Sequence, residues 1–178
     1  EDGQDIGVDL VAECADGKGY AANCTHALGA DLPSRARRRV ATQDVLVSSL
    51  EGSLSSIALV DSEYDQALCS TGFHVVRSKR LLPEVLFILL RSEIGQKQLE
   101  RGCNGGIMSS IRQEEFCKAH LPIPPEEVQQ KIKETVSHSF MMIRQAGNLI
   151  GGSTNIMTSC SAEKNSWEAC LTRLGDLK

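Results

Sequence analysis

The chain has 178 residues, enough for one ordinary domain with a hydrophobic core and a small appendage. Apolar residues make up 41% and charged residues 24%, which excludes wholesale disorder, and the 4% of aromatic residues is too little for a platform that stacks single-stranded nucleic acid. The net charge is −4, but residues 35–112 hold eleven basic and eight acidic residues, whereas residues 1–34 hold one and seven. The middle of an acidic chain is therefore basic.

No apolar window is long enough to cross a membrane, and the acidic N-terminus beginning Glu1-Asp2 lacks the features of a secretory signal. The sequence therefore predicts no membrane partner and a cytoplasmic location. The seven cysteines are irregularly spaced and include no C-x-x-C pair, which predicts reduced thiols and no metal site.

In chain order, residues 1–39 are rich in Gly, Ala and Asp and are predicted as loop with short elements. Runs of β-branched residues then predict strands at 44–48, 56–60 and 73–77, and the turn residues between them favour a largely antiparallel sheet. Pro83 suits the first position of a buried helix over 83–90, and Ser92 is placed to cap a second helix that runs to Arg101.

Glycine and proline mark the next boundaries. Residues 102–106 are predicted as a flexible loop, residues 109–112 as a short segment, and the proline-rich residues 120–125 as an extended exit. A long helix is predicted from Glu126 to about Ile150, ending at Gly151-Gly152, and Ser161 is placed to cap a last amphipathic helix.

The long helix carries an apolar stripe in steps of four and three residues. Two interpretations of the stripe stay open: a face buried in the core, or a seam for a partner helix. Its members are Val128, Ile132, Val136, Phe140, Ile143, Gly147 and Ile150.

No catalytic motif stands out in the sequence. The chain has no phosphate-binding loop, nucleophile elbow or H-E-x-x-H motif, and its four histidines are scattered. The chemistry-bearing feature is a pair of basic clusters, which suit either a solvated surface or contacts to phosphates. The clusters are Arg35, Arg37, Arg38 and Arg39, and Arg77, Lys79 and Arg80.

An ordered series of motifs in the middle of the chain resembles a known bacterial family. The series comprises residues 44–48, 52–54, 57–60, 69–73, 83–84, 86–92, 95–96, 98–99, 110–114 and 121–132. In this order the motifs resemble a target recognition domain and its conserved helix, from the specificity subunit of type I restriction-modification enzymes. The resemblance covers roughly residues 40–150.

The resemblance implies an α+β fold: a compact recognition domain with a twisted, largely antiparallel sheet and packed helices, followed by a long C-terminal helix. Residues 1–125 would be the recognition domain, residues 126–150 a dimerisation or spacer helix and residues 151–178 a helical tail. The implied activity is sequence-specific binding of double-stranded DNA without catalysis. The implied partners are DNA adenine methyltransferase (modification) subunits, which use S-adenosylmethionine, and a restriction/translocase subunit; this chain itself would bind no cofactor.

The family carries two recognition domains in each subunit, whereas this chain has one, so the resemblance implies a half-subunit that forms a homodimer, or a fragment. Two alternatives stay open. The chain can be the C-terminal recognition domain of a fused DNA adenine methyltransferase or restriction polypeptide, or a protein-interaction module that does not touch DNA.

Under the DNA-binding interpretation, the two basic clusters contact phosphates and a Gly- and Ser-rich stretch approaches the base edges. Arg112 in that stretch could form paired hydrogen bonds with guanine, or else a salt bridge with Glu114 or Glu115. The expected base-contacting residues are Asn104, Gly105, Ser109, Ser110 and Arg112. The expected residues of the partner helix are Val128, Ile132, Val136, Phe140 and Ile143.

Overall fold

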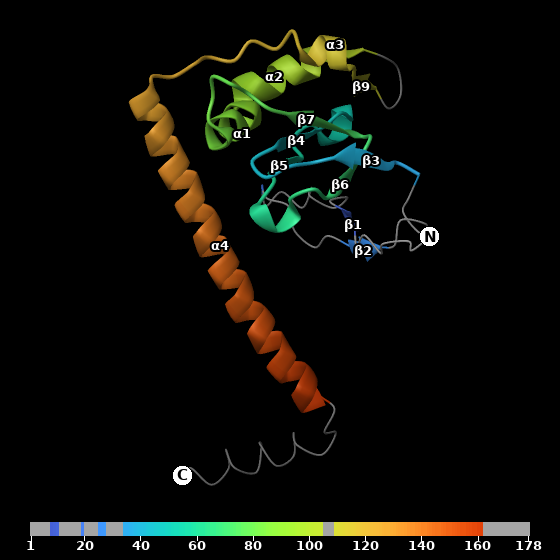
Figure 1. Ribbon diagram of the computed structural model, residues 1–178, viewed down its shortest axis with the longest axis vertical. Coiled ribbons are helices and arrows are strands. Elements are labelled where there is room, and N and C mark those ends of the chain that lie inside the picture. Colours follow the sequence, from blue (N-terminus) through green and yellow to red (C-terminus); the bar gives the residue numbers. More distant parts are fainter. Residues whose placement is uncertain (1–7, 11–18, 20–24, 28–33, 105–108, 162–178) are drawn as a thin grey trace, which may run out of the picture. The chain divides into compact units, whose positions relative to one another are not determined.

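A computed structural model describes residues 8–10, 19, 25–27, 34–104 and 109–161 (Figure 1). The chain divides into two compact units, Glu1–Val136 and Ser137–Lys178, and one long helix contributes residues to both. Gly105 and the helix predicted after Ser161 lie outside the described residues.

The centre of the first unit is a three-stranded antiparallel sheet in the order β5-β4-β7. Its strands are β4 (Val45–Ser48), β5 (Ile57–Leu59) and β7 (Phe73–Val76), which confirms the three predicted strands and their antiparallel arrangement. All of β4 is buried, because it is the middle strand and both faces of the sheet are covered.

A second sheet has the order β2-β1-β6-β3. It consists of β1 (Val8–Leu10), β2 (Thr25–Ala27), β3 (Ala36–Arg39) and β6 (Leu68–Ser70), and only its β1–β6 pair is parallel. Three of the four arginines of the first cluster, Arg37, Arg38 and Arg39, are therefore part of a strand, although residues 1–39 are predicted as loop with short elements.

The hydrophobic core lies between the two sheets. Because side chains alternate along a strand, Leu46 of β4 and Ala58 of β5 face the same side, where they meet Cys69 of β6 and the buried Val40 and Val60. Burial raises the pKa of the Cys69 thiol to about 11, so this thiol is protonated and unreactive at neutral pH.

Two helices cover the opposite face of the three-stranded sheet (Figure 1). α1 (Pro83–Arg91) begins at Pro83 as predicted, and α2 (Glu93–Gly102) is capped by Ser92, whose Oγ accepts the Gly95 N–H at 3.2 Å. The helices approach closely at Gly95, where a Cβ atom would lie 2.2 Å from the Leu89 carbonyl oxygen.

Short elements connect the larger ones. They are the 3₁₀ helices η2 (Glu51–Ser53) and η3 (Ser62–Tyr64), the hairpin strands β8 (Cys103–Asn104) and β9 (Ser110–Ile111), and the helix α3 (Gln113–Phe116). The prediction of a loop over 102–106 is wrong for its first three residues. Gly102 ends α2, and Cys103 and Asn104 pair with β9.

α4 (Glu126–Ser161) begins where predicted but does not end at Ile150. Helical structure continues through Gly151-Gly152, so the prediction that these glycines interrupt the helix is wrong. Each glycine costs about 1 kcal/mol relative to alanine, which lowers helical stability without breaking the hydrogen-bonding pattern.

The apolar stripe on α4 is only partly buried. Val136 and Phe140 are buried, whereas Val128 and Ile143 are each 42% exposed and Ile132 is intermediate. The stripe is therefore not a continuous core face. Among the described residues, no helix is both long and apolar enough to span a membrane.

Candidate nucleic-acid interface

β3 displays its arginines on two faces. Arg37 and Arg39 are exposed on one face, whereas Arg38 points to the other face and is half-buried, as strand alternation requires. The Arg38 guanidinium donates from Nη1 to the Phe73 carbonyl at 2.5 Å, and Arg37 donates from Nε to the Ser34 carbonyl at 2.6 Å. The strand therefore offers Arg37 and Arg39 to solvent and uses Arg38 to hold the two sheets together.

A row of backbone hydrogen bonds joins four segments at one end of the first unit, which we call the hairpin end. The Thr71 N–H donates to the Arg35 carbonyl at 2.8 Å, and the Ser49 N–H donates to the Gly72 carbonyl at 2.9 Å. The Ile111 N–H then donates to the Ser49 carbonyl at 2.8 Å. The structure thus brings the exposed Arg35 to the same end of the unit as the segment around Ile111.

Of the residues predicted to contact bases, three lie in or beside the β8–β9 hairpin. Asn104 pairs with Ser110 across the hairpin, and Ser110 also forms a bridge with Leu50. Ser109 is buried, and its hydroxyl donates to the Glu51 carboxylate. The Ser109 hydroxyl therefore already has a structural partner.

Arg112 directly follows the hairpin and is exposed at the start of α3. Among the described residues, no ion pair joins it to Glu114 or Glu115, and Glu115 pairs with Lys118 at 2.7 Å. The salt bridge considered as the alternative role of Arg112 is thus not formed. Its guanidinium is presented to solvent at the hairpin end.

A buried histidine fixes the hairpin to the central sheet. His74 on β7 lies 3.1 Å through Nε2 from the Ile111 carbonyl, and its ring packs against Phe116 with the centroids 4.8 Å apart. Burial lowers the pKa of His74, so the neutral ring, donating from Nε2, is favoured. His74 therefore holds the segment that leads to Arg112.

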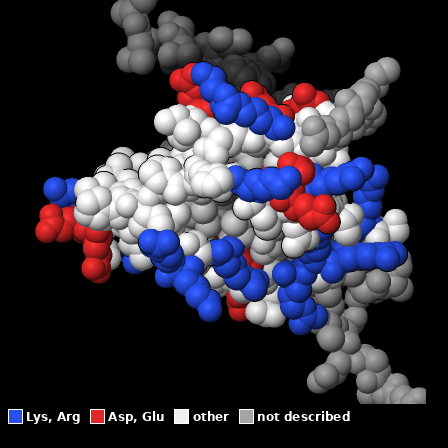
Figure 2. Space-filling model, turned by 90° about the horizontal axis from the view of Figure 1, so that it is seen from above, with Lys and Arg blue, Asp and Glu red and all other residues white. Residues whose placement is uncertain are grey.

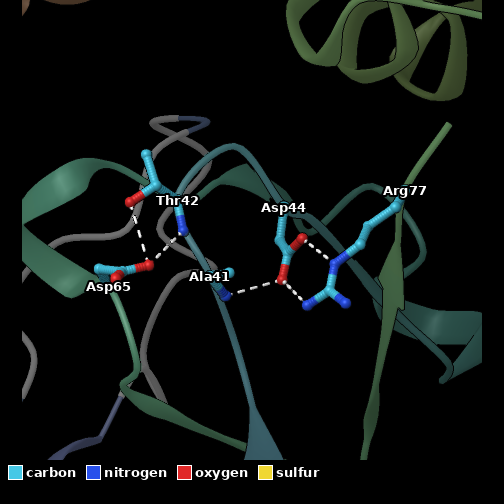
Figure 3. Close-up of polar contacts among 5 residues, drawn as sticks. All are labelled: Ala41, Thr42, Asp44, Asp65 and Arg77. Atoms are coloured by element: carbon cyan, nitrogen blue, oxygen red, sulfur yellow. Dashed lines mark hydrogen bonds and ion pairs between the residues drawn. The ribbon is translucent and has the colours of Figure 1, made fainter. Parts of the chain in front are cut away.

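At the opposite end of β7, Arg77 forms an ion pair with Asp44 (Figure 3). We call this pair the clasp, and this end of the unit the clasp end. The Asp44 side chain is only 3% exposed and accepts hydrogen bonds from Arg77 Nε, from Arg77 Nη2 at 2.7 Å and from the Ala41 N–H at 2.8 Å. The hydrogen bond to Asp44 raises the pKa of Arg77. Arg77, predicted as a phosphate contact, thus has a carboxylate partner, although 65% of its side chain stays exposed.

Two turns at this clasp end are tied together. The Asp65 carboxylate accepts the Thr42 N–H at 2.8 Å and the Thr42 hydroxyl at 3.2 Å, and the backbone bond contributes most to lowering the pKa of Asp65 (Figure 3). Each turn also holds one glutamine in the left-handed region, Gln43 with φ 70° and Gln66 with φ 64°. Neither conformation is predictable from the sequence, because glutamine is not a typical residue for the left-handed region.

The second basic cluster continues from Arg77 into a loop whose backbone is hydrogen-bonded to Ser78 and Gln129. Lys79 and Arg80 are exposed, while the Ser78 hydroxyl accepts the Arg80 N–H at 3.1 Å. Gln129 of α4 accepts the Leu82 N–H at 3.0 Å and donates to the Arg80 carbonyl at 3.3 Å. The loop borders a surface hollow of about 430 Å³, whose lining includes Gln43, Lys79, Arg80 and Glu126.

The first basic cluster runs along β3 from the hairpin end toward the clasp end, where the second cluster follows Arg77. β7 separates the ends by about 13 Å, at 3.3 Å for each of its four residues. Arg35 lies at the hairpin end, whereas Arg39 lies toward the clasp end, since Ala41 is bonded to Asp44. Figure 2 shows one face of the molecule on which Lys and Arg side chains predominate in the lower part.

Comparison with known proteins identifies this arrangement. Residues 35–141 match the family model described as the type I restriction modification DNA specificity domain. The chain belongs to this family. The match includes both basic clusters, the hairpin and the first part of α4.

Relatives of this specificity domain include proteins of known structure. The type I restriction enzyme HindI specificity subunit of Haemophilus influenzae is 29% identical over 111 residues, which cover 60% of this chain and 24% of that protein. The HsdS subunit of Thermoanaerobacter tengcongensis is 27% identical, with a TM-score of 0.65 over 88% of this chain and 41% of that one. A chain from a study of assembly and conformational transition of the type I R-M system is 29% identical, with a TM-score of 0.66 over 89% and 43%.

The chain therefore spans about a quarter of the curated relative and about two fifths of each solved chain. These likenesses confirm the predicted family and α+β fold class. Within the part of the specificity domain that the structure describes, no group of three or more His, Cys, Asp or Glu side chains could hold a metal ion. The cysteines described there, Cys69, Cys103 and Cys117, are unpaired thiols.

Proposed function

We propose that this specificity domain recognises a defined sequence in double-stranded DNA, as a component of a type I restriction-modification system without a catalytic site of its own. The observation that carries the proposal is the strip of exposed cations along β3, Arg37 and Arg39, which extends to Arg35 at one end and to Lys79 and Arg80 at the other. Membership of the specificity-domain family supports it.

Duplex recognition needs phosphate contacts for affinity and base contacts for sequence discrimination. The strip suits phosphate contacts, because its guanidinium and ammonium groups are exposed and extend beyond both ends of β3. At the hairpin end, Arg112 suits base contacts, since arginine can bond to guanine through two donors. His74 and Ser49 fix the backbone beside Arg112, which would make this contact geometrically selective.

The proposal extends to the assembly in which the domain works. Its partners would be DNA adenine methyltransferase (modification) subunits, which would bind S-adenosylmethionine, and a restriction/translocase subunit. Residues 1–125 would read the DNA, residues 126–150 would form the dimerisation or spacer helix of a coiled coil, and residues 151–178 would be a tail. A second recognition domain would come from another copy of the chain or from the rest of a longer subunit.

A second candidate function rests on the exposed apolar residues of α4. Val128, Met141, Met142 and Ile143 are each 42–53% exposed, which suits a module that binds only a protein partner. The two functions differ in their response to salt, because phosphate contacts release counterions on binding and an apolar seam does not.

The test is selection of bound duplexes from a random pool at low and moderate salt, with the full chain alone and with its modification subunits. DNA recognition predicts one enriched motif and an affinity that falls steeply as salt rises. A symmetric two-part motif would also support the homodimer. Failure to enrich any sequence under either condition would refute the DNA-reading proposal and favour the protein-interaction module.

Variants of the strip sharpen this test. Replacing Arg37 and Arg39 together by Gln removes two expected phosphate contacts, so the slope of log K against log salt should become shallower by about 1.8, at about 0.9 per contact. Lys97→Ala is the matched control, because Lys97 is an exposed cation on α2 that is paired with Glu93. It should leave the slope unchanged.

A further inference from the structure

The backbone of Gln43 adopts a conformation that glutamine rarely takes. Its φ of 70° lies in the left-handed region, where Gly, Asn and Asp are the usual residues. Residues held in such conformations persist when the surrounding structure determines them, and they are concentrated at functional sites. An exposed glutamine at such a position therefore needs an explanation beyond the turn itself.

Contacts on both sides of Gln43 hold its backbone in place. The Gln43 N–H donates to the Val60 carbonyl at 2.9 Å. Thr42, on one side, is bonded to Asp65, and Asp44, on the other, is clasped by Arg77 (Figure 3). The turn thus presents the residue at position 43 from a fixed backbone, a requirement for selective contacts.

The Gln43 side chain, unlike its backbone, has no partner among the described residues, since no hydrogen bond to its amide is found there. Gln43 is one of the residues that line the hollow of about 430 Å³. Lys79 and Arg80 line the same hollow from the loop whose backbone is hydrogen-bonded to Ser78 and Gln129. One carboxylate, Glu126, shares the lining. A free amide thus stands next to two cations on one surface.

From this arrangement we infer that Gln43 contacts a base edge, preferably adenine, while Lys79 and Arg80 bind the neighbouring phosphates. An amide side chain offers one donor and one acceptor, which match N7 and the N6 amino group of adenine in the major groove. The inference rests on the proposed function and adds to it a specificity-determining residue at the clasp end, remote from the hairpin end.

Gln66 provides a matched control for Gln43. It is also an exposed glutamine in the left-handed region, and its turn is tied to that of Gln43 through Asp65 and Thr42. Gln66 is not among the residues that line the hollow. Glycine at either position relieves the backbone and removes the amide, and at position 66 it also removes the hydrogen bond of the Gln66 side chain to Asp65. Urea unfolding of both variants is therefore measured beside their DNA affinity.

The experiment is selection from a random duplex pool, followed by affinity measurement on the enriched sequence, for the full chain, Gln43→Gly and Gln66→Gly. We expect Gln43→Gly to lose preference at one adenine and to bind about tenfold to a hundredfold more weakly. Gln66→Gly should keep the motif and the affinity. Gln43→Glu, which keeps the length but can only accept, should shift preference at that position from adenine toward cytosine.

The outcomes separate this inference from the proposal on which it rests. If the parent chain selects a motif and Gln43→Gly selects the same one with equal affinity, Gln43 does not read a base, although DNA recognition stands. Equal losses in Gln43→Gly and Gln66→Gly would also overturn the inference, because the effect would then belong to the paired turns. If the parent chain selects nothing, the proposed function fails together with the inference.

Discussion

Replacing Arg77 by alanine leaves a buried carboxylate without its cation. Asp44 would keep the Ala41 N–H but lose two charge-assisted hydrogen bonds, each of which contributes about 1.5–3 kcal/mol. The sum is an upper bound, because 65% of the Arg77 side chain is exposed and water can reach the oxygens from that side. We expect a net loss of about 2 kcal/mol in the free energy of unfolding.

For a chain of this length, that loss lowers the melting temperature by about 4–8 °C. Urea unfolding followed by circular dichroism measures it, with Arg80→Ala as the control, since Arg80 is exposed and should change stability by less than about 0.5 kcal/mol. Arg77→Lys should fall between the two, because lysine keeps the charge and loses the paired geometry. If Arg77→Ala unfolds within about 0.5 kcal/mol of the parent chain, the clasp does not stabilise the fold.

Three further predictions follow from the packing. Gly95→Ala should destabilise by at least about 2 kcal/mol, because its Cβ would meet backbone atoms, whereas Gly52→Ala, with open space around it, should be near neutral in the same urea assay. Because burial lowers the pKa of His74 in the folded state, stability should fall as the pH drops below 6.5; His74→Gln, which retains a donor but does not titrate, should reduce this pH dependence. If the proposed homodimer forms through α4, Ile143→Lys should weaken self-association at least about tenfold in sedimentation velocity, and Ile94→Lys, at an exposed site on α2, should not.

Short-range sequence patterns predicted the strands and helices whose formation depends on neighbouring residues. β4, β5 and β7 follow from β-branched runs between turns, and α1 and α2 from Pro83 and Ser92. β3 was not predicted because four of the five residues 35–39 are arginine, so the sequence shows no alternation of apolar and polar residues there. The inward-facing Arg38 donates to the Phe73 carbonyl, a contact 35 residues away that no local pattern reveals.

The candidate site likewise has some features that the sequence predicts and others that depend on contacts between distant residues. The basic residues are visible in the composition, but their availability depends on distant partners: Arg77 meets Asp44 across 33 positions, whereas Arg112 is left to solvent. Nothing in the sequence marks Gln43, since its conformation is imposed by contacts that only the folded chain makes. The end of α4 was misjudged because glycine lowers helical propensity without forbidding a helix.

The junction between α1 and α2 has a consequence for how such domains can vary. Ser92 alone separates the two helices, accepts the Gly95 N–H and donates to the Leu89 carbonyl at 2.6 Å. Ser92 is extended, so an inserted residue here would shift and reorient α2 relative to α1 and remove the close approach of Gly95 to the Leu89 carbonyl. Length differences between related domains should therefore be absent from this junction and be tolerated in the connection over residues 121–125, where the backbone is neither helical nor in a sheet.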